Sequence, residues 1–247
     1  MSGHSHYSTI KRQKEANDAA KGKVFSKMAR AIAIAIKAGG GADPAQNYKL
    51  RIAIEQAKAL NVPKSNIDRI LSRAQEEVSY DEVSYEGYGP EGIAVIVESA
   101  TDNRNRTSQE IKNIFERSGG SLAGPGSVSF NFEPKALMVV NKELDVDSQM
   151  LKLIDLGVDD VDESGDGIEV YTTQEKAGEI KELLEKSGFT ISSFEIIKKP
   201  KNVMTVTDEK KARRIITFLE TLEDHEDVQS VFSNLDIPDD VADKIEY

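Results

Sequence analysis

ALMVVNKELDVDSQMLKLIDLGVDDVDESGDGIEVYTTQEKAGEIKELLEKSGFTISSFEII, residues 136–197, decides the fold class. ALMVV, IEVYTT and ISSFEII have the composition and spacing of strands, whereas DSQMLKLIDLG and QEKAGEIKELLEKSG have the spacing of amphipathic helices. The run VDDVDES supplies one more short strand before a glycine-containing turn. The resulting order, βαββαβ, is that of a ferredoxin-like unit, which we predict for residues 135–201.

The segments on either side predict a second α/β domain. Residues 80–134 supply a strand at 93–99, a helix at 105–118 and a strand at 127–133, and residues 202–247 supply another strand, helix and strand. Together they predict a discontinuous ferredoxin-like domain, 80–134 and 202–247, into which 135–201 is inserted. Two consecutive domains are the simpler alternative.

Prolines and a glycine-rich segment agree with these predicted domain boundaries. Pro134 and Pro200 stand at the two crossing points between the predicted domains. YDEVSYEGYGPEG, residues 80–92, is rich in glycine and tyrosine and is predicted to be a linker.

Residues 1–79 predict a helical N-terminal domain. One helix is expected at 23–37, a second from the Asp43-Pro44 pair to about Leu60, and a third from about Pro63. The predicted fold class is therefore α+β, with a three-helix domain and two ferredoxin-like α/β domains, one inserted in the other.

Charge is distributed unevenly along this acidic chain, whose net charge is −11. Residues 1–79 hold 14 Lys/Arg against 7 Asp/Glu, a net charge of +7, whereas residues 80–247 hold 18 against 36, a net charge of −18. Such asymmetry indicates a polyanion-binding module attached to other domains, although solvated basic helix faces are an equally good explanation of charge alone.

The helix at 23–37 carries the strongest signal. At 100° per residue its basic side chains gather on one side of the helix, opposite Phe25, Met28, Ile32 and Ile36. We expect Lys23, Lys27 and Arg30 to face outward on a surface without a compensating acidic residue, and such a surface favours phosphate backbones. The basic candidates of this region are Lys11, Arg12, Lys14, Lys21, Lys23, Lys27, Arg30 and Lys37.

The later helices add weaker candidates. Arg51, Lys58, Arg69 and Arg73 could extend the basic surface, but pairing with nearby Glu55 and Asp68 is slightly favoured.

A second basic candidate is the turn TDNRNRT, residues 101–107, between a predicted strand and a predicted helix. Backbone N–H groups at a helix start attract anions, and Arg104 and Arg106 add two guanidinium groups suited to phosphate. A capped turn with exposed arginines is an equally good interpretation.

Several classes of function find no support. The chain has no cysteine, and the His4–His6 pair lacks the further ligands that a zinc site needs, so we expect no metal and no cofactor. GGGADP lacks the lysine of a phosphate-binding loop, and no catalytic set is evident, so we expect neither an enzyme nor a small-molecule substrate. The longest apolar run is too short to span a bilayer, and the start of the chain lacks a signal-type segment, so we expect a cytoplasmic protein with no membrane partner.

Longer motifs resemble one family. GHS (3–5), GKVFSKMAR (22–30) and KAGGGADPAQNYKLR (37–51) are similar to the N-terminal signature of the YebC family, whose mitochondrial relative is the translational activator of cytochrome oxidase. The match continues through NVPKSNIDR, YEGYGPEG, TDNRNRT and GGSL. The resemblance implies three domains and a non-enzymatic role in the cytoplasm. It also implies either DNA-binding transcription regulation or binding to the ribosome that relieves stalling, notably at proline-rich stretches.

This chain departs from the family pattern in two places. It has His6-Tyr7 where the family often has Lys-Trp, and Ala20 where a second basic residue is frequent. Tyr7 keeps an aromatic ring that could stack on a base, whereas both changes reduce the local positive charge.

Three hypotheses follow: a DNA-binding transcriptional regulator, a ribosome-associated translation factor that contacts rRNA, and a protein-interaction scaffold. The basic N-terminal domain favours nucleic acid over the scaffold. The acidity of residues 80–247 would repel a duplex lying along them and leans slightly toward RNA, whereas the family resemblance leans toward DNA.

Overall fold

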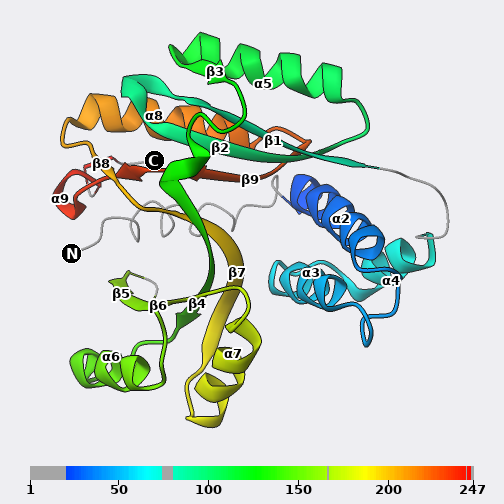
Figure 1. Ribbon diagram of the computed structural model, residues 1–247, viewed down its shortest axis with the longest axis vertical. Coiled ribbons are helices and arrows are strands. Elements are labelled where there is room, and N and C mark those ends of the chain that lie inside the picture. The colour runs from blue at the N-terminus through cyan, green and yellow to red at the C-terminus, as the bar shows by residue number, and fades with distance from the viewer. Residues whose placement is uncertain (1–20, 74–79, 166, 243, 246–247) are drawn as a thin grey trace. The chain divides into compact units, whose positions relative to one another are not determined.

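A computed structural model describes residues 21–73, 80–165, 167–242 and 244–245 of the 247-residue chain. A helical N-terminal part is followed by α/β parts with antiparallel sheets, which confirms the predicted fold class (Figure 1). The described residues form two compact units, one of 21–129 with 213–233 and one of 130–212 with 234–245. The division into three domains stays a prediction.

The described residues of the N-terminal part form three helices: α2 (Lys21–Ala38), α3 (Tyr48–Ala59) and α4 (Lys64–Arg73). Their buried core includes Ile32 and Leu50. Phe25, Met28, Ile32 and Ile36 of α2 all belong to or pack against this core, as the helical spacing predicted.

Helix α3 begins later than predicted, because its N-cap is Asn47 and not Asp43. The side-chain oxygen of Asn47 accepts a hydrogen bond from Leu50 N at 3.0 Å, while its amide donates to the carbonyls of Ala35 and Gly41 at 2.8 Å. Asp43 instead accepts from Ala45 N at 2.9 Å in the preceding turn. A buried amide that joins α2 to α3 therefore outcompetes the local Asp-Pro signal.

The first α/β sheet has the antiparallel order β3-β1-β2-β9. Its strands are β1 (Asp81–Tyr88), β2 (Ala94–Thr101), β3 (Ser121–Ala123) and β9 (Val228–Ser233). Helices α5 (Arg104–Ser118) and α8 (Glu209–Glu223) meet through the buried rings of Phe115 and Phe218, whose centroids are 5.0 Å apart in an edge-to-face arrangement.

The prediction that residues 80–92 form a linker is wrong, because β1 occupies most of them. Only Pro90–Gly92 forms a turn, of 3₁₀ type. A Cβ on Gly87 would lie 2.6 Å from the Ser121 carbonyl oxygen, so glycine is what allows β1 to approach β3. Gly87, which in the sequence suggested a turn, is thus needed inside strand β1.

Two further strands differ from expectation. The predicted strand at 127–133 is replaced by a 3₁₀ turn, Ser129–Asn131, and β4 begins at Phe132. Of the strand expected at 202–207, only β8 (Met204–Thr205) is extended, and it pairs in parallel with β10 (Leu235–Asp236). Strand β1 therefore completes the sheet in place of β8.

The second four-stranded sheet matches the prediction for 136–197. It contains β4 (Phe132–Val140), β5 (Asp160–Ser164), β6 (Gly167–Thr172) and β7 (Ile191–Pro200) in the all-antiparallel order β5-β6-β4-β7. Helices α6 (Val146–Asp155) and α7 (Ala177–Lys186) bury Leu153, Ile180 and Leu184 against it. This strand order is the ferredoxin-like arrangement.

The first residue of this sheet along the chain lies beside its last residue. Phe132 on β4 is paired with Pro200 on β7. Just outside, the Asn131 carbonyl accepts from Lys201 N at 2.7 Å, and its side-chain oxygen accepts from Asn202 N at 3.1 Å. The chain thus enters and leaves the sheet at adjacent points.

A short helix, α9 (Asp239–Ala242), follows β10. Among the described residues, no helix combines the length and the apolar content that crossing a bilayer requires.

Gly119 ends α5 in the left-handed conformation, with φ at 84°. Replacing it with alanine is expected to lower the free energy of unfolding by about 1–2 kcal/mol, because a Cβ is disfavoured there. Gly178→Ala in α7 is the matched control, since its Cβ meets nothing within 4 Å and alanine favours a helix. Urea titration should show opposite signs for the two variants, and a neutral Gly119→Ala would contradict the assignment of strain.

Candidate functional site

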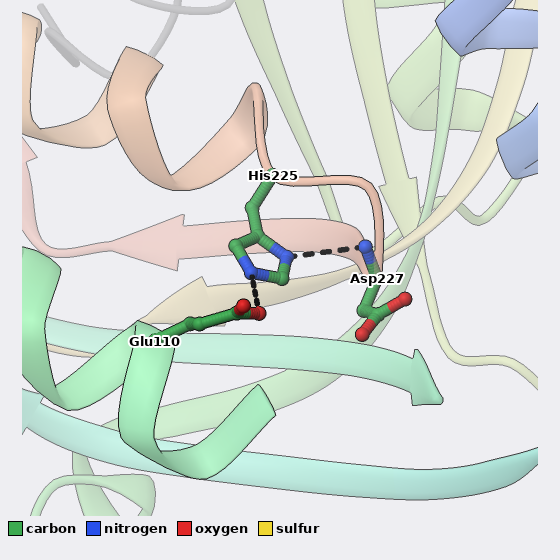
Figure 2. A group of neighbouring side chains, drawn as sticks. All are labelled: Glu110, His225 and Asp227. Carbon is green, nitrogen blue, oxygen red and sulfur yellow. Dashed lines mark hydrogen bonds and ion pairs between the residues drawn. The ribbon is translucent and has the colours of Figure 1, made fainter. Parts of the chain in front are cut away.

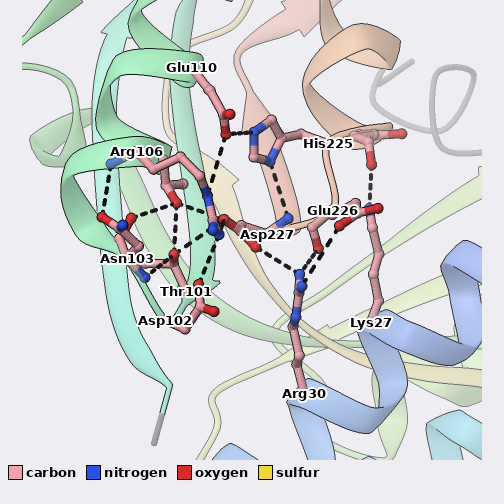
Figure 3. Close-up of polar contacts among 12 residues, drawn as sticks. Lys27, Arg30, Thr101, Asp102, Asn103, Arg106, Glu110, His225, Glu226 and Asp227 are labelled. Atoms are coloured by element: carbon pink, nitrogen blue, oxygen red, sulfur yellow. Dashed lines mark hydrogen bonds and ion pairs between the residues drawn. The ribbon is translucent and has the colours of Figure 1, made fainter.

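The candidate site is centred on Asp227, which ends the turn between α8 and β9. Its side chain is only 3% exposed. Two neighbouring segments reach it: the turn from β2 into α5, and one face of α2 (Figure 3). Two sequence-predicted arginines, Arg30 and Arg106, meet on this one carboxylate.

The TDNRNRT turn is built around hydrogen bonds that place Thr107 against Asp227. Asn103 is the N-cap of α5 and accepts from Arg106 N at 3.1 Å. The Thr107 hydroxyl donates to Asp227 Oδ2 at 2.7 Å, and the Thr101 hydroxyl lies 3.2 Å from the same oxygen. The turn is therefore capped, as one of the two interpretations proposed.

Both arginines bind Asp227 from different helices. Arg106 donates from a terminal guanidinium nitrogen to Asp227 Oδ2 at 2.9 Å and to Asp102 at 2.8 Å. Arg30 on α2 forms an ion pair with the other oxygen, Oδ1, also at 2.9 Å. One buried carboxylate thus links α2, α5 and β9 by charge-assisted hydrogen bonds.

Helix α2 also contacts the backbone around the C-terminal end of α8. The Lys27 ammonium donates to the carbonyl of Glu223, the last residue of α8, and Arg30 donates to the carbonyl of Glu226. A cation at a helix C-terminus is favoured by the helix dipole. The Arg30 guanidinium additionally lies 5.6 Å from the ring centroid of Tyr80.

The surroundings keep Asp227 ionised. Burial alone would raise its pKa, but hydrogen bonds from Thr107 and Arg106 and the charges of Arg30 and Arg106 outweigh burial. The pKa of Asp227 therefore lies below its ordinary value, and the carboxylate is charged near neutral pH.

Both ring nitrogens of His225 have hydrogen-bond partners (Figure 2). Its Nδ1 accepts a hydrogen bond from Asp227 N at 3.1 Å, so the neutral ring carries its proton on Nε2 and donates to Glu110 at 2.9 Å. Glu110, His225 and Asp227 bring potential metal ligands within 4.8 Å of one another. A divalent cation there would face the two guanidinium groups that already occupy Asp227, so this donor set does not fit a metal well.

A pocket of about 690 Å³ opens at this turn. Three arginines, four carboxylates and one histidine give it mixed charge rather than a uniformly positive surface. It is lined by Arg30, Asp102, Arg106, Glu110, Asn113, Ile114, Arg117, His225, Glu226 and Asp227.

The structure corrects the expected orientation of the basic face of α2. Lys27 and Arg30 do not project freely into solvent. Lys27 contacts the last residue of α8, Arg30 contacts the turn that follows, and the Arg30 side chain is 17% exposed. The helical spacing correctly placed them opposite the apolar side, but the acidic partners come from residues almost 200 positions away. Charge compensation is therefore supplied by tertiary contacts.

The other candidates lie in four places along the chain. Lys21 and Lys23 are in the first turn of α2, Lys37 is exposed in its last turn, and Arg104 is exposed at the start of α5. Predictions for Tyr7, Lys11, Arg12 and Lys14 lie outside the described residues.

Sequence reasoning missed Asp227, Thr101, Thr107, His225 and Glu110. Asp227 closes the acidic run EDHED, residues 223–227, which in sequence is typical of a solvated turn. The sequence did contain one indication of a buried acceptor near this turn: Thr101 and Thr107 lie on either side of the Asn103 cap. Two hydroxyls on one turn suggest an acceptor that both can reach, and in the structure that acceptor is Asp227.

Comparison with known proteins places the chain in a family. Residues 5–77 match the model of the TACO1/YebC protein N-terminal domain, and residues 80–235 match that of the TACO1/YebC second and third domain. A "Probable transcriptional regulatory protein" of Dictyoglomus thermophilum is 46% identical over 98% of both chains. A protein of the same name from Methylacidiphilum infernorum is 43% identical over 100% of both.

A solved structure has a similar fold. The crystal structure of a conserved hypothetical protein from Aquifex aeolicus superposes with a TM-score of 0.81 at 41% identity, covering 90% of this chain and 93% of the other. Matches over nearly the whole length at these identities have one meaning: the chain belongs to the TACO1/YebC family.

Proposed function

We propose that this protein is a non-enzymatic, nucleic-acid-binding regulator of gene expression that acts on transcription by binding DNA in the cytoplasm. The observation that carries the proposal is the net charge of +7 on residues 1–79 of a chain whose remainder has −18. Relatives named as probable transcriptional regulatory proteins supply the direction toward transcription.

Exposed cations on α3 and α4 support this proposal. Lys49, Lys58, Lys64 and Arg69 are exposed, and none forms an ion pair with another described residue. The prediction that Lys58 and Arg69 pair with Glu55 and Asp68 is therefore wrong among the residues that the structure describes. Cations of this kind contact phosphates and give affinity without sequence choice.

Arg51 has a different role. Its guanidinium donates to the carbonyls of Pro44 and Ala45 at 3.1 Å, which ties down the turn before α3. We therefore leave it out of the proposed surface.

Reversing the charges of Lys49, Lys58 and Lys64 to glutamate is expected to weaken binding to a 30-base-pair duplex. Losing three phosphate contacts should also reduce the slope of log affinity against log salt concentration by about 3. Fluorescence anisotropy over a series of salt concentrations measures both effects.

The matched control carries the same change in net charge elsewhere. Lys152, Lys176 and Lys210 are exposed in the acidic part of the chain, so their reversal to glutamate tests net charge without touching α3 or α4. Equal loss of binding in both triple variants would contradict the proposed surface, and binding unchanged by the first triple would exclude it.

Contact with rRNA on the ribosome is a second candidate, favoured by the net charge of −18 on residues 80–247. This charge repels a duplex lying along it but suits docking onto basic ribosomal proteins. Crosslinking in cells, followed by sequencing of the bound nucleic acid, separates the candidates. Promoter DNA would support transcription, rRNA would support the ribosome, and recovery of neither would leave a protein-interaction scaffold.

A further inference from the structure

We infer that the contact between α2 and the turn after α8 is an autoinhibitory latch, which nucleic acid must open before it can use the basic face of α2. The latch consists of Lys27 and Arg30 on one side and the Glu223 carbonyl, Glu226 and Asp227 on the other. This inference rests on the proposed function and assigns a regulation to the same basic surface.

Helix α2 is attached to the turn by polar contacts. Among the described residues, the hydrophobic core of α2, α3 and α4 draws on residues 25–71, so this helical part has its own buried interior. The bonds that join it to the turn are hydrogen bonds and ion pairs of Lys27 and Arg30 (Figure 3). Polar attachments between separately packed parts favour relative motion, because opening them exposes little apolar surface.

Asp227 keeps hydrogen-bond partners when Arg30 leaves. Thr101, Thr107 and Arg106 all reach its Oδ2 oxygen and come from the β2–α5 segment, whereas Arg30 binds Oδ1. Release of Arg30 therefore does not leave an unpaired buried carboxylate, which would be very costly. Arg106 is the fixed partner and Arg30 the releasable one.

The closed latch holds two cationic groups that a polyanion needs for binding. A phosphate can replace a carboxylate as the partner of a guanidinium and a carbonyl as the partner of an ammonium. Nucleic acid and the turn after α8 therefore compete for Lys27 and Arg30. The apparent affinity is then the intrinsic affinity multiplied by the fraction of molecules in which the latch is open.

Distance measurement on a doubly labelled chain tests the inference. The chain has no cysteine, so Ser26→Cys on α2 and Thr221→Cys on α8, both at exposed positions, give two unique sites for nitroxide labels. Pulsed electron paramagnetic resonance is expected to give a short distance in the free protein and a longer one with a 30-base-pair duplex or a single-stranded RNA.

A substitution in the latch gives an independent readout. Asp227→Asn should shift the free protein toward the longer distance and tighten nucleic-acid binding, on the order of tenfold if the latch is mostly closed. Glu82→Gln removes one negative charge from an exposed position on β1 and controls for net charge. Equal tightening by both variants would mean that charge, not the latch, is responsible.

The outcomes separate the latch from the proposed function. Nucleic acid that binds without changing the distance in the otherwise unaltered labelled chain overturns the latch and leaves the function standing. Failure of both DNA and RNA to bind at low salt overturns both. If Asp227→Asn does not fold, the distance measurement on the chain that retains Asp227 still decides.

Discussion

Replacing Asp227 with alanine is expected to lower the free energy of unfolding by about 3–5 kcal/mol. The substitution removes a carboxylate that is 3% exposed and leaves Thr107, Thr101 and two guanidinium groups without their shared acceptor. Arg30, whose side chain is 17% exposed, would lose its ion-pair partner as well. This is the most costly kind of polar substitution, because one partner of a buried network is deleted.

Chemical denaturation at pH 7 measures the effect, with Glu82→Ala as the control because Glu82 is exposed on β1. A surface carboxylate of that kind should change stability by less than about 0.5 kcal/mol. A loss below about 1 kcal/mol in Asp227→Ala would show that water replaces the carboxylate and that the network is not a stabilising element.

At acid pH, the difference in unfolding free energy between Asp227→Ala and the parent protein should become smaller. The pKa of Asp227 is lowered in the folded state, because hydrogen bonds and the arginine charges outweigh burial. Its contribution is therefore present above the unfolded pKa, about 4, and is lost as the pH falls through the lower folded value. The stability gap between Asp227→Ala and the parent protein should stay constant near neutrality and narrow below about pH 4.

Replacing Glu86 with alanine is the second large effect we expect, a loss of roughly 2–4 kcal/mol. Glu86 lies on β1 and its carboxylate accepts three backbone N–H groups, from Gly126, Val128 and Ser129, each at 2.9 Å. Burial would raise the pKa of Glu86, but these hydrogen bonds outweigh it and lower the pKa. One charged side chain thus organises the loop that precedes β4.

Hydrogen exchange gives the residue-level check for Glu86→Ala. The amides of Gly126, Val128 and Ser129 should lose protection, while those of β2 should lose it only to the extent of the global destabilisation. Glu82→Ala, on the same strand but exposed, should leave all of them unchanged. Undiminished protection of the three amides would mean that Glu86 does not hold this loop.

Much of the fold follows from local periodicity. The ferredoxin-like sheet of β4–β7 was predictable because each strand and helix carries its own apolar spacing, and the strand order follows from that element order. Strand β1 was not predictable in the same way. Gly87 is there to let β3 approach, and a glycine that serves a tertiary contact cannot be told from one that serves a turn.

The site was predictable only in part. Arg30 and Arg106 were found from the sequence because basic residues in a helix face and at a helix start have local signatures. Asp227 has none, since its partners Arg30 and Thr101 lie far away in the chain and no periodicity links them. The same long separation explains why the basic face of α2 was expected to be uncompensated.

The pairing of Phe132 with Pro200 has a consequence for the order of folding. Strand β9 has to find β2 across the whole stretch between Thr101 and Val228. Once β4 and β7 have paired, residues 131 and 202 are neighbours, and the length of chain between β2 and β9 that remains to be closed is roughly halved. The entropic free-energy cost of closing the loop then falls by about 0.6 kcal/mol. If the sheet of β4–β7 forms first, it therefore shortens the effective chain length between β2 and β9 and makes their pairing a more local contact.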